Sequence, residues 1–404
     1  MDAPLKGIRI IEWAIWQQGP AATTTLADMG AEVIKLEDRK WGDPGRGMMP
    51  TSPPIGGKGV LNFLFECNNR HKKSVAIDLK RPEAREIVYK LIEKSDVFVQ
   101  NFRLGVAKRL GLDYATLKAR NPRLIYATAS GYGPEGPDAG EPSFDLMGQA
   151  RSGLMMTVGG APDDPPRPVC AGVADEAGAI VLALGIVTAI VARDKYGVGQ
   201  EVDTSLLGSM TLLQRLNVAS CVMTGREFGR MPRTRNFNPL WNHYQCADGK
   251  WICFAMAEPD RYWKDFCTAL GLAELIEDPR FSALRVRAHN AAALIEILDR
   301  TLAARTRAEW MAILKAGGDL VYTVVNSITD LPDDPQVVAN DYIVDYEHPE
   351  HGKVKLVGMP IRFSQTPANP RGAAPSLGQH TDAVLAGLGY SRDDLARLRE
   401  AGAI

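Results

Sequence analysis

Apolar and polar positions in the first 130 residues alternate between strand-like and helix-like patterns. Short runs rich in β-branched residues are typical of buried strands, and they occupy residues 7–13, 30–37, 74–79, 97–100 and 124–129. Helix-prone segments lie between them at 21–29 and 82–94, and Gly30 ends the first of these. Strands that alternate with helices predict an α/β fold, with a mostly parallel sheet and helices on both faces.

The pattern changes after residue 144. Residues 144–193 are helical and end in an apolar stretch, 177–192, which is shorter than the ~20 residues that span a bilayer and predicts a core helix. A strand is expected at 199–205, a hairpin around Asp248-Gly249, helices near 260–270, 289–303 and 307–315, then strands at 342–363 and helices at 382–401. We therefore expect a large domain from residues 1–224 and 331–404, with a smaller α+β domain at 225–330.

Composition and charge narrow the function classes. Apolar residues make up 45% and charged residues 24% of the 404 positions, as in ordinary soluble globular proteins, and the net charge is −1. No general attraction to nucleic acid or to an anionic membrane follows from that charge, so a polyanionic ligand needs a local basic cluster. The six cysteines form no CxxC pair, so no metal site is expected. The first residues lack the features of a signal peptide, which favours a cytoplasmic location.

The first strand–helix–strand unit invites a dinucleotide-binding interpretation, because Glu37-Asp38 ends its second strand. In NAD-binding folds a G-x-G-x-x-G turn brings backbone amides onto the pyrophosphate. This chain has Gln17-Gln18-Gly19-Pro20 at that turn, with one glycine and a proline that carries no N–H. NAD is therefore not expected as a cofactor.

Several longer segments carry a family resemblance. They are LKGIRIIEW (5–13), GPAATTTLADMGAEVIKLE (19–37), GDPGRG (42–47), KKSVAIDLK (72–80), DVFVQNF (96–102), RLGLDY (109–114), NPRLIYATASGYGPEGP (121–137), FDLMGQARSGLM (144–155), GVGQEVDTSLL (197–207) and LGQHTDAVLAGLGYS (377–391). In this order, over nearly the whole chain, they resemble class III CoA-transferases, a group that includes formyl-CoA and carnitine CoA-transferases and α-methylacyl-CoA racemases.

The resemblance implies a fold, substrates and a nucleophile. It implies a Rossmann-like large domain built from both chain ends, a small domain, an interlocked homodimer, and an acyl-CoA and a free carboxylic acid as substrates. Asp175, in AGVADEAG, matches the family's catalytic aspartate, which would form an aspartyl anhydride and then an aspartyl-CoA thioester. From its residue type alone Asp175 is an expected helix N-cap, in a position where the helix dipole favours the ionised form. Its neighbour Glu176 is a less favoured candidate for the nucleophile.

The resemblance also implies contacts with CoA. Gln17 falls where formyl-CoA transferases carry a glutamine near the thioester, and it could donate to the oxyanion. Other matching or basic positions expected to contact CoA are Arg46, Lys72, Lys73, Asn101, Phe102 and Arg109. The family's arginine after Glu37 is replaced by Asp38, so Arg39 is the candidate for its adenine contact.

Three departures bear on the reaction. Racemases of this group place a histidine before the position of Asp145, where this chain has Phe144, and a phenyl ring cannot exchange a proton. The alternatives, a racemase and a CoA-binding protein without turnover, are therefore less favoured than a transferase. Met48 replaces a tryptophan of formyl-CoA transferases, and residues 225–330 lack their glycine-rich flap. Both departures favour an acid bulkier or more apolar than oxalate.

Overall fold

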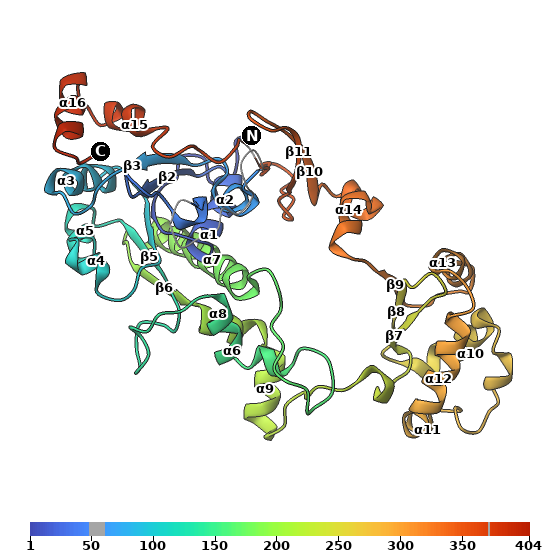
Figure 1. The fold of residues 1–404 in the computed structure, drawn as a ribbon. Helices are drawn as coiled ribbons and strands as arrows, with labels where there is room; N and C mark the ends of the chain where they lie inside the picture. Colours follow the sequence, from blue (N-terminus) through green and yellow to red (C-terminus); the bar gives the residue numbers. More distant parts are fainter. Residues whose placement is uncertain (48–60, 371) are drawn as a thin grey trace. The chain divides into compact units, whose positions relative to one another are not determined.

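The computed structural model describes residues 1–47, 61–370 and 372–404, and the chain divides into two compact units (Figure 1). The large unit comprises Met1–Met155, Pro168–Glu227 and Pro335–Ile404, and the small unit comprises Met156–Arg167 and Phe228–Asp334. Residues 156–167, which the sequence pattern placed in the large domain, therefore belong to the small unit. Arg230 holds them there, because its guanidinium donates to the carbonyl oxygens of Met156 and Pro165, each at 2.9 Å.

A six-stranded sheet forms the centre of the large unit, with the strand order β3-β2-β1-β4-β5-β6 and every pairing parallel. The strands are β1 (Arg9–Trp13), β2 (Glu32–Glu37), β3 (Lys73–Ala76), β4 (Val97–Gln100), β5 (Ile125–Ser130) and β6 (Glu201–Ser205). The predicted α/β fold with a parallel sheet is confirmed. Because β1 has β2 on one side and β4 on the other, the strand order reverses between β1 and β4, and a crevice opens at their carboxyl ends.

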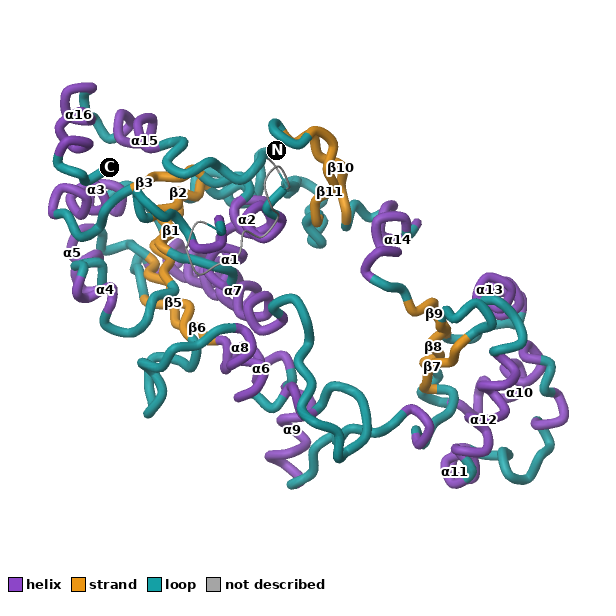
Figure 2. The backbone as a smooth tube through the Cα atoms, viewed as in Figure 1, coloured by secondary structure: helices purple, strands orange, loops and turns teal. Residues whose placement is uncertain are grey.

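Helices cover both faces of this sheet (Figure 2). Alternate strand residues point to opposite faces, so Ile11 and Phe98 join one core while Ile10 and Val99 join the other. The first core takes in α3 (Pro82–Ile92), α4 (Val106–Arg109), α5 (Tyr114–Arg120), α15 (Thr381–Gly387) and α16 (Arg392–Glu400), so the C-terminal helices complete the domain that the first strands begin. The second core takes in α1 (Gln18–Asp28) and α7 (Val173–Tyr196).

Helix α7 is the longest element of the chain as described, at 24 residues, and it is long and apolar enough to cross a membrane. Half of its most apolar window is buried inside the protein. Leu182 and Ile186 pack with α1 and the sheet, which is the packing predicted for a core helix. Ile180, Leu184 and Val191 are 65%, 62% and 62% exposed, so a second apolar side of α7 faces away from this core.

The large unit contains further elements outside the sheet and its two cores. They are α2 (Phe63–Asn69), α6 (Asp145–Arg151), α8 (Leu206–Leu213), α9 (Arg215–Thr224), α14 (Pro335–Ala339) and the antiparallel pair β10 (Ile343–His348) and β11 (Gly352–Val357). Short 3-10 turns occur at Pro44–Arg46 and Leu154–Met156.

The small unit contains the antiparallel sheet β7-β8-β9, formed by β7 (Trp241–Gln245), β8 (Trp251–Ala255) and β9 (Tyr322–Val325). The predicted hairpin around Asp248-Gly249 joins β7 to β8, and Gly249 has the positive φ (74°) that such a turn requires. The sheet packs on α10 (Pro259–Leu270), α12 (Ala291–Leu302) and α13 (Arg307–Ala316), with α11 (Leu284–His289) preceding α12. Its core is rich in aromatic residues such as Phe254 and Phe266.

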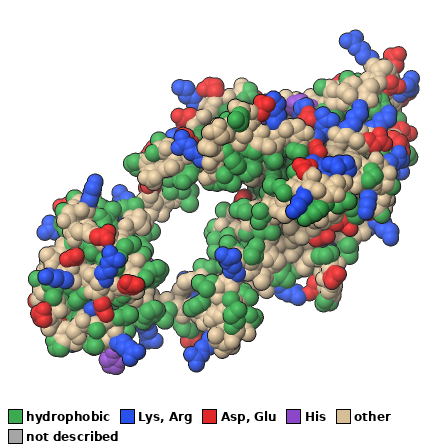
Figure 3. Space-filling model, turned by 180° about the vertical axis from the view of Figure 1, so that it is seen from behind, with side chains coloured by type: hydrophobic (Ala, Val, Ile, Leu, Met, Phe, Trp, Pro, Cys, Tyr) green, Lys and Arg blue, Asp and Glu red, His purple; other side chains and the backbone are tan. Residues whose placement is uncertain are grey.

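The charge distribution agrees with the near-zero net charge of the sequence. On the face shown in Figure 3, basic and acidic side chains are interspersed over the surface of each unit. This face therefore offers no large surface of one charge to a polyanionic ligand.

Candidate active site

Three sequence-predicted residues meet at the crevice of the large unit. Gln17 follows β1, Asn101 follows β4, and Asp175 lies in the first turn of α7. All three line one cavity of about 250 Å³. A second cavity, of about 350 Å³, shares Gln17 and Asp175 and is lined further by Trp16, Leu64, Phe144, Asp145 and Leu146. We call the second cavity the acyl cavity. The two chain segments that carry the predicted nucleophile and the predicted amide donor are thus brought to one place.

The start of α7 is capped from outside by another carboxylate. The N-cap residue is Gly172, with φ 74°, and no side-chain cap bond comes from α7 itself. Instead Oδ1 of Asp145, on α6, accepts the backbone N–H groups of Ala174 at 2.7 Å and Asp175 at 3.2 Å. Gln149 donates to the other oxygen of Asp145 at 2.6 Å. The side chain of Asp175 is therefore not the cap, contrary to what its residue type alone suggests.

Asp175 is an unusually basic carboxylate. Burial, followed by the nearby charges of Asp145 and Glu176, raises its pKa from 3.8 to about 7. The favourable dipole at the helix start does not hold the pKa of this side chain at its ordinary value, because burial and two like charges act in the opposite direction. A carboxylate with a raised pKa is more basic, and therefore a better nucleophile, than an ordinary aspartate, provided the pH is high enough to ionise it.

The loop that presents Gln17 is held at successive residues. Asn101 accepts the N–H of Ile15 at 3.0 Å and donates to its carbonyl oxygen at 2.7 Å. Trp16 adopts a left-handed conformation, φ 65°, and its N–H donates to Oδ1 of Asp43 at 3.0 Å. The Nε2 of Gln17 donates to Oε1 of Glu176 at 2.8 Å. The amide of Asn101, predicted to contact CoA, therefore holds the loop that carries Gln17.

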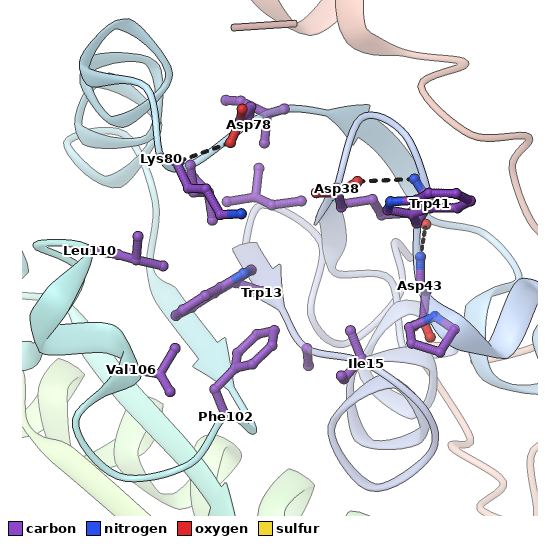
Figure 4. Close-up of a pocket in the computed structure, with 17 residues that line it drawn as sticks. Trp13, Ile15, Asp38, Trp41, Asp43, Asp78, Lys80, Phe102, Val106 and Leu110 are labelled. Atoms are coloured by element: carbon purple, nitrogen blue, oxygen red, sulfur yellow. Dashed lines mark hydrogen bonds between the residues drawn. The ribbon is translucent and has the colours of Figure 1, made fainter. Parts of the chain in front are cut away.

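A third cavity, of about 330 Å³, lies at the carboxyl ends of β1, β2 and β3 (Figure 4). We call it the nucleotide pocket. Trp13 and Phe102 stack at 4.1 Å between ring centroids, and Figure 4 shows Trp41 across the pocket from them. Lys80 extends its ammonium into the pocket, and Asp38 lies on the side of Trp41. The flat apolar surfaces suit an aromatic base. Lys80 is the one cation among the described lining residues, which also include the acidic Glu37, Asp38, Asp43 and Asp78.

The nucleotide pocket and the cavity at Asp175 share walls. Ile15 and Phe102 line both of them. A long, narrow ligand could therefore place one end against Trp41 and the other near the nucleophile, with its middle passing over Phe102. The predicted role of Phe102 as a CoA contact agrees with this position.

The structure corrects the prediction for Lys72. Its side chain is fully buried, and its Nζ donates to Oε2 of Glu12 at 2.6 Å and to the carbonyl oxygen of Pro20 at 2.8 Å. Burial lowers the pKa of Lys72 to about 8. Enclosed in this way, Lys72 cannot reach a phosphate, and we remove it from the proposed CoA contacts. The cluster it belongs to also contains Lys35 and Asp43, whose side chains are equally buried and lie 2.8 Å apart.

The other predicted cations have different surroundings. Arg46 binds Glu37 through two hydrogen bonds, at 2.7 and 2.8 Å, and covers the Phe65 ring at 3.8 Å. Lys73 is about half exposed and pairs with Glu32 at 2.5 Å. Neither lines the nucleotide pocket as described. Both cations are already neutralised by carboxylates, so any contact with CoA would have to compete with these pairs.

Arg39 and Arg109 are exposed, and neither appears among the described residues of the nucleotide pocket. The guanidinium of Arg39 packs against Gly402, where a Cβ would approach its Nη1 to 2.7 Å. Arg109 ends α4, the helix that contributes Val106 to the pocket. Their roles stay predictions. Met48 lies outside the described residues.

Four residues of the site were missed from the sequence: Asp43, Trp41, Lys80 and Asp145. Lys80 had a usable signal, because it follows β3 and the carboxyl ends of parallel strands share one edge of the sheet. Asp145 had none, since its role as a cap depends on α6 meeting α7. Among the described residues, no group of three or more His, Cys, Asp or Glu side chains could hold a metal ion.

Comparisons with known proteins place the chain in one family. The family model of CoA-transferase family III matches residues 5–381. The chain is 30% identical to the (R)-2-hydroxy-4-methylpentanoate CoA-transferase of Clostridioides difficile, over 98% of each chain, and 32% identical to an acyl-CoA transferase of Fusarium pseudograminearum, over 99% of this chain and 88% of the relative. The crystal structure of a CAIB/BAIF family protein from Brucella suis superposes with a TM-score of 0.85 at 30% identity, over 96% of this chain and all of that chain.

Proposed function

Because the chain belongs to CoA-transferase family III and is a CoA-transferase, we propose that it uses Asp175 as a nucleophile to move CoA from an acyl-CoA to a free carboxylic acid. One observation carries the proposal. A desolvated carboxylate, raised in pKa to about 7, stands beside an amide donor in two connected cavities, one of which reaches the nucleotide pocket.

The proposed reaction keeps the energy of the thioester through two covalent stages. The carboxylate of Asp175 attacks the thioester carbonyl, the C–S bond breaks, and the CoA thiolate leaves an acyl–aspartyl anhydride. The thiolate then attacks the aspartyl carbonyl and expels the first acid as its carboxylate. The carboxylate of the second acid then attacks the carbonyl of the aspartyl-CoA thioester, which breaks the C–S bond, expels the CoA thiolate and forms a second anhydride. The thiolate attacks the carbonyl of the second acid in this anhydride, which releases the new acyl-CoA and ionised Asp175. No proton needs to be gained or lost overall.

Each tetrahedral stage develops an oxyanion that must be met by a donor. Gln17 is the proposed donor, since its carboxamide and Asp175 line the same two cavities. The proposed CoA site places the adenine against Trp41 in the nucleotide pocket, the phosphates near Lys80 and Arg109, and the pantetheine over Phe102. Arg39, Arg46 and Lys73 remain proposed outer contacts.

The acyl cavity favours a monocarboxylic acid with an apolar body. Trp16, Leu64 and Phe144 supply its apolar walls, while Asp145 and Asp175 supply two carboxylates. The described residues that line it include no Lys or Arg. A second carboxylate on the substrate would therefore meet like charge without a counterion, whereas an aryl or branched chain would be desolvated favourably.

The racemase alternative lacks its second base. Phe144 stands in the acyl cavity, and the described residues that line the two cavities at Asp175 include no histidine. His380 accepts the N–H of Ser74 on β3, which is an edge strand of the sheet. Two-base exchange of an α-proton is therefore not favoured.

We also propose that the enzyme works as an interlocked homodimer in the cytoplasm, with no nucleic acid or membrane partner. The exposed apolar side of α7 supports an extensive protein interface, and so do Leu216 and Val222 of α9, each 75% exposed.

The test measures CoA transfer directly. Purified enzyme is incubated with acetyl-, succinyl- or 4-methylpentanoyl-CoA and with 3-phenylpropanoate, 2-hydroxy-4-methylpentanoate or succinate, and new thioesters are detected by mass spectrometry. We expect transfer to the apolar acids, none with Asp175→Ala, and full transfer with the control Asp345→Ala, whose side chain is 86% exposed. Hydroxylamine should trap the intermediate as a hydroxamate at Asp175.

Each other outcome has a clear meaning. Transfer that survives Asp175→Ala would refute the nucleophile. Uptake of solvent deuterium at the α-carbon without transfer would indicate the racemase. Tight CoA binding without either reaction would indicate a binding protein, and preference for succinate would refute the proposed substrate class.

A further inference from the structure

Glu176 has no part in the covalent steps, yet it contacts Gln17, the proposed oxyanion donor. It follows Asp175 in the first turn of α7, and its Oε1 accepts a hydrogen bond from Nε2 of Gln17 at 2.8 Å. This bond joins residues 159 positions apart in the sequence. We infer that Glu176 is a positioning residue of the proposed reaction, whose carboxylate holds the Gln17 carboxamide toward the acyl group at Asp175. The inference rests on the proposed function.

The Gln17 carboxamide is contacted on two sides, and its hydrogen bond to Glu176 lies at the exposed surface of the protein. The carboxamide lies directly over Gly172, where a Cβ would be 2.7 Å from Oε1 and 2.8 Å from Nε2 of Gln17. Gly172 is the N-cap of α7, and glycine suits this position for two reasons: its φ is positive, and a Cβ would collide with the Gln17 carboxamide. The carboxamide is thus held between the backbone of Gly172 and the carboxylate of Glu176.

The hydrogen-bonding capacity of the carboxamide explains what this contact does. A glutamine amide has two N–H donors, and Glu176 takes one of them. Because Glu176 accepts this N–H, the NH₂ group of the amide faces Glu176 and the carbonyl oxygen faces away. The second N–H stays available for a substrate oxygen. Without Glu176 the amide could turn over, presenting its carbonyl oxygen to a developing oxyanion, which would repel it.

The backbone of the loop is held by other residues. Asn101 fixes Ile15 and Asp43 fixes Trp16, both through main-chain groups. These contacts place the Cα of Gln17, whereas Glu176 acts on the end of its side chain. Removing Glu176 should therefore leave the loop in place and alter only the orientation of the amide.

Glu176 also acts on Asp175 through its charge, and this second effect can be separated from the first. The carboxylates that face Asp175 are Asp145, from α6, and Glu176, from α7 itself, and both contribute to its raised pKa. Cys67, on α2, is the titratable group that faces Glu176 from the neighbouring helix. Different substitutions of Glu176 can remove its negative charge and its hydrogen bond to Gln17 one at a time.

The experiment measures kcat and KM for CoA transfer from pH 5 to 9 in the full-length enzyme. Glu176→Gln removes the charge and keeps an oxygen acceptor, so it should move the acidic limb of the rate profile to lower pH and leave kcat at pH 9 within about twofold. Glu176→Asp keeps the charge and shortens the reach, so it should leave the limb in place and lower kcat about tenfold, a fraction of what loss of a whole oxyanion donor costs. KM for acyl-CoA should stay unchanged in both.

A double-substitution cycle tests whether Glu176 acts through Gln17. Glu176→Ala should lower kcat at pH 9 about tenfold in the native background and not at all in a Gln17→Ala background. Glu86→Ala, which removes an exposed glutamate of α3, is the matched control and should change nothing. Thermal unfolding of each variant checks that the loss is not one of folding.

Two results would overturn the inference. One is a Glu176→Ala enzyme as active as the native enzyme at pH 9. The other is a double variant whose loss of kcat equals the product of the losses in Glu176→Ala and Gln17→Ala, which would mean that the two residues act independently. Both differ from failure of the proposed function, in which the native enzyme itself would transfer no CoA.

Discussion

Replacing Asp175 by asparagine should stabilise the protein while abolishing its activity. The folded chain holds this side chain partly buried beside Asp145 and Glu176, where an ionised carboxylate is costly. Asparagine has nearly the same shape and carries no charge at any pH. The substitution therefore removes an electrostatic cost that the native enzyme bears for the sake of its nucleophile, a common conflict between stability and activity.

The sign and size of the effect follow from the two pKa values of Asp175. In the unfolded chain the carboxyl group ionises near 3.8, and in the folded chain near 7. The unfolded state therefore loses its proton first, so the native protein loses stability as the pH rises from about 4 to about 7. At 1.36 kcal/mol per pH unit the full cost is about 4 kcal/mol above pH 7. Because part of the side chain still meets solvent, we expect the substitution to recover about 2 kcal/mol.

Urea denaturation at pH 4, 6 and 8 checks this prediction. The free energy of unfolding of Asp175→Asn should equal that of the native protein at pH 4 and exceed it increasingly toward pH 8. The control Asp345→Asn, at an exposed side chain of the same unit, should show no such trend. A native protein that is equally or more stable than Asp175→Asn at pH 8 would refute the argument, because it would mean that the carboxylate is better solvated than its position implies.

Four further predictions follow from the same geometry. The rate of CoA transfer should rise with pH and level off above about 7, as Asp175 ionises, in a profile of kcat/KM from pH 5 to 9. Lys80→Ala should raise KM for acyl-CoA about tenfold with kcat nearly unchanged, measured by steady-state kinetics, because it removes one phosphate contact in the nucleotide pocket. Asp43→Asn should lower the free energy of unfolding by about 3 kcal/mol in urea, since it leaves the buried ammonium of Lys35 with one carboxylate fewer. Leu184→Glu should weaken the proposed dimer, seen as a shift toward monomer in sedimentation velocity.

Each of these has its own contrary outcome. A rate that is flat from pH 5 to 9 would mean that Asp175 is ionised throughout or is not the nucleophile. Equal losses of affinity for acyl-CoA and for a pantetheine thioester without the nucleotide would show that Lys80 does not meet a phosphate. Normal stability of Asp43→Asn would show that water or a neighbour replaces the lost charge. A dimer unaffected by Leu184→Glu would place the interface elsewhere.

Local sequence pattern was sufficient for the central sheet because its strands are short apolar runs between helix and turn signals. The segment 97–100 was predicted with the bounds of β4, and β1, β2 and β5 differ from prediction by one or two residues at their ends. The segment 156–167 could not be assigned in this way, because what places it in the small unit is a pair of bonds from Arg230, more than sixty residues away. Periodicity describes neighbours along the chain and carries no information about such contacts.

The basic residues show most clearly why a site needs coordinates as well as motifs. Lys72 and Lys80 lie eight positions apart on either side of β3, and both are lysines that could meet a phosphate. Lys72 precedes the strand, and its ammonium turns into the core to meet Glu12, while Lys80 follows the strand at the carboxyl edge and reaches into the nucleotide pocket. In a parallel sheet the edge on which a residue lies decides whether it can meet a ligand in the crevice. The density of positive charge in the sequence therefore favoured a lysine that the structure buries, whereas position relative to the strand favours Lys80, which lines the nucleotide pocket.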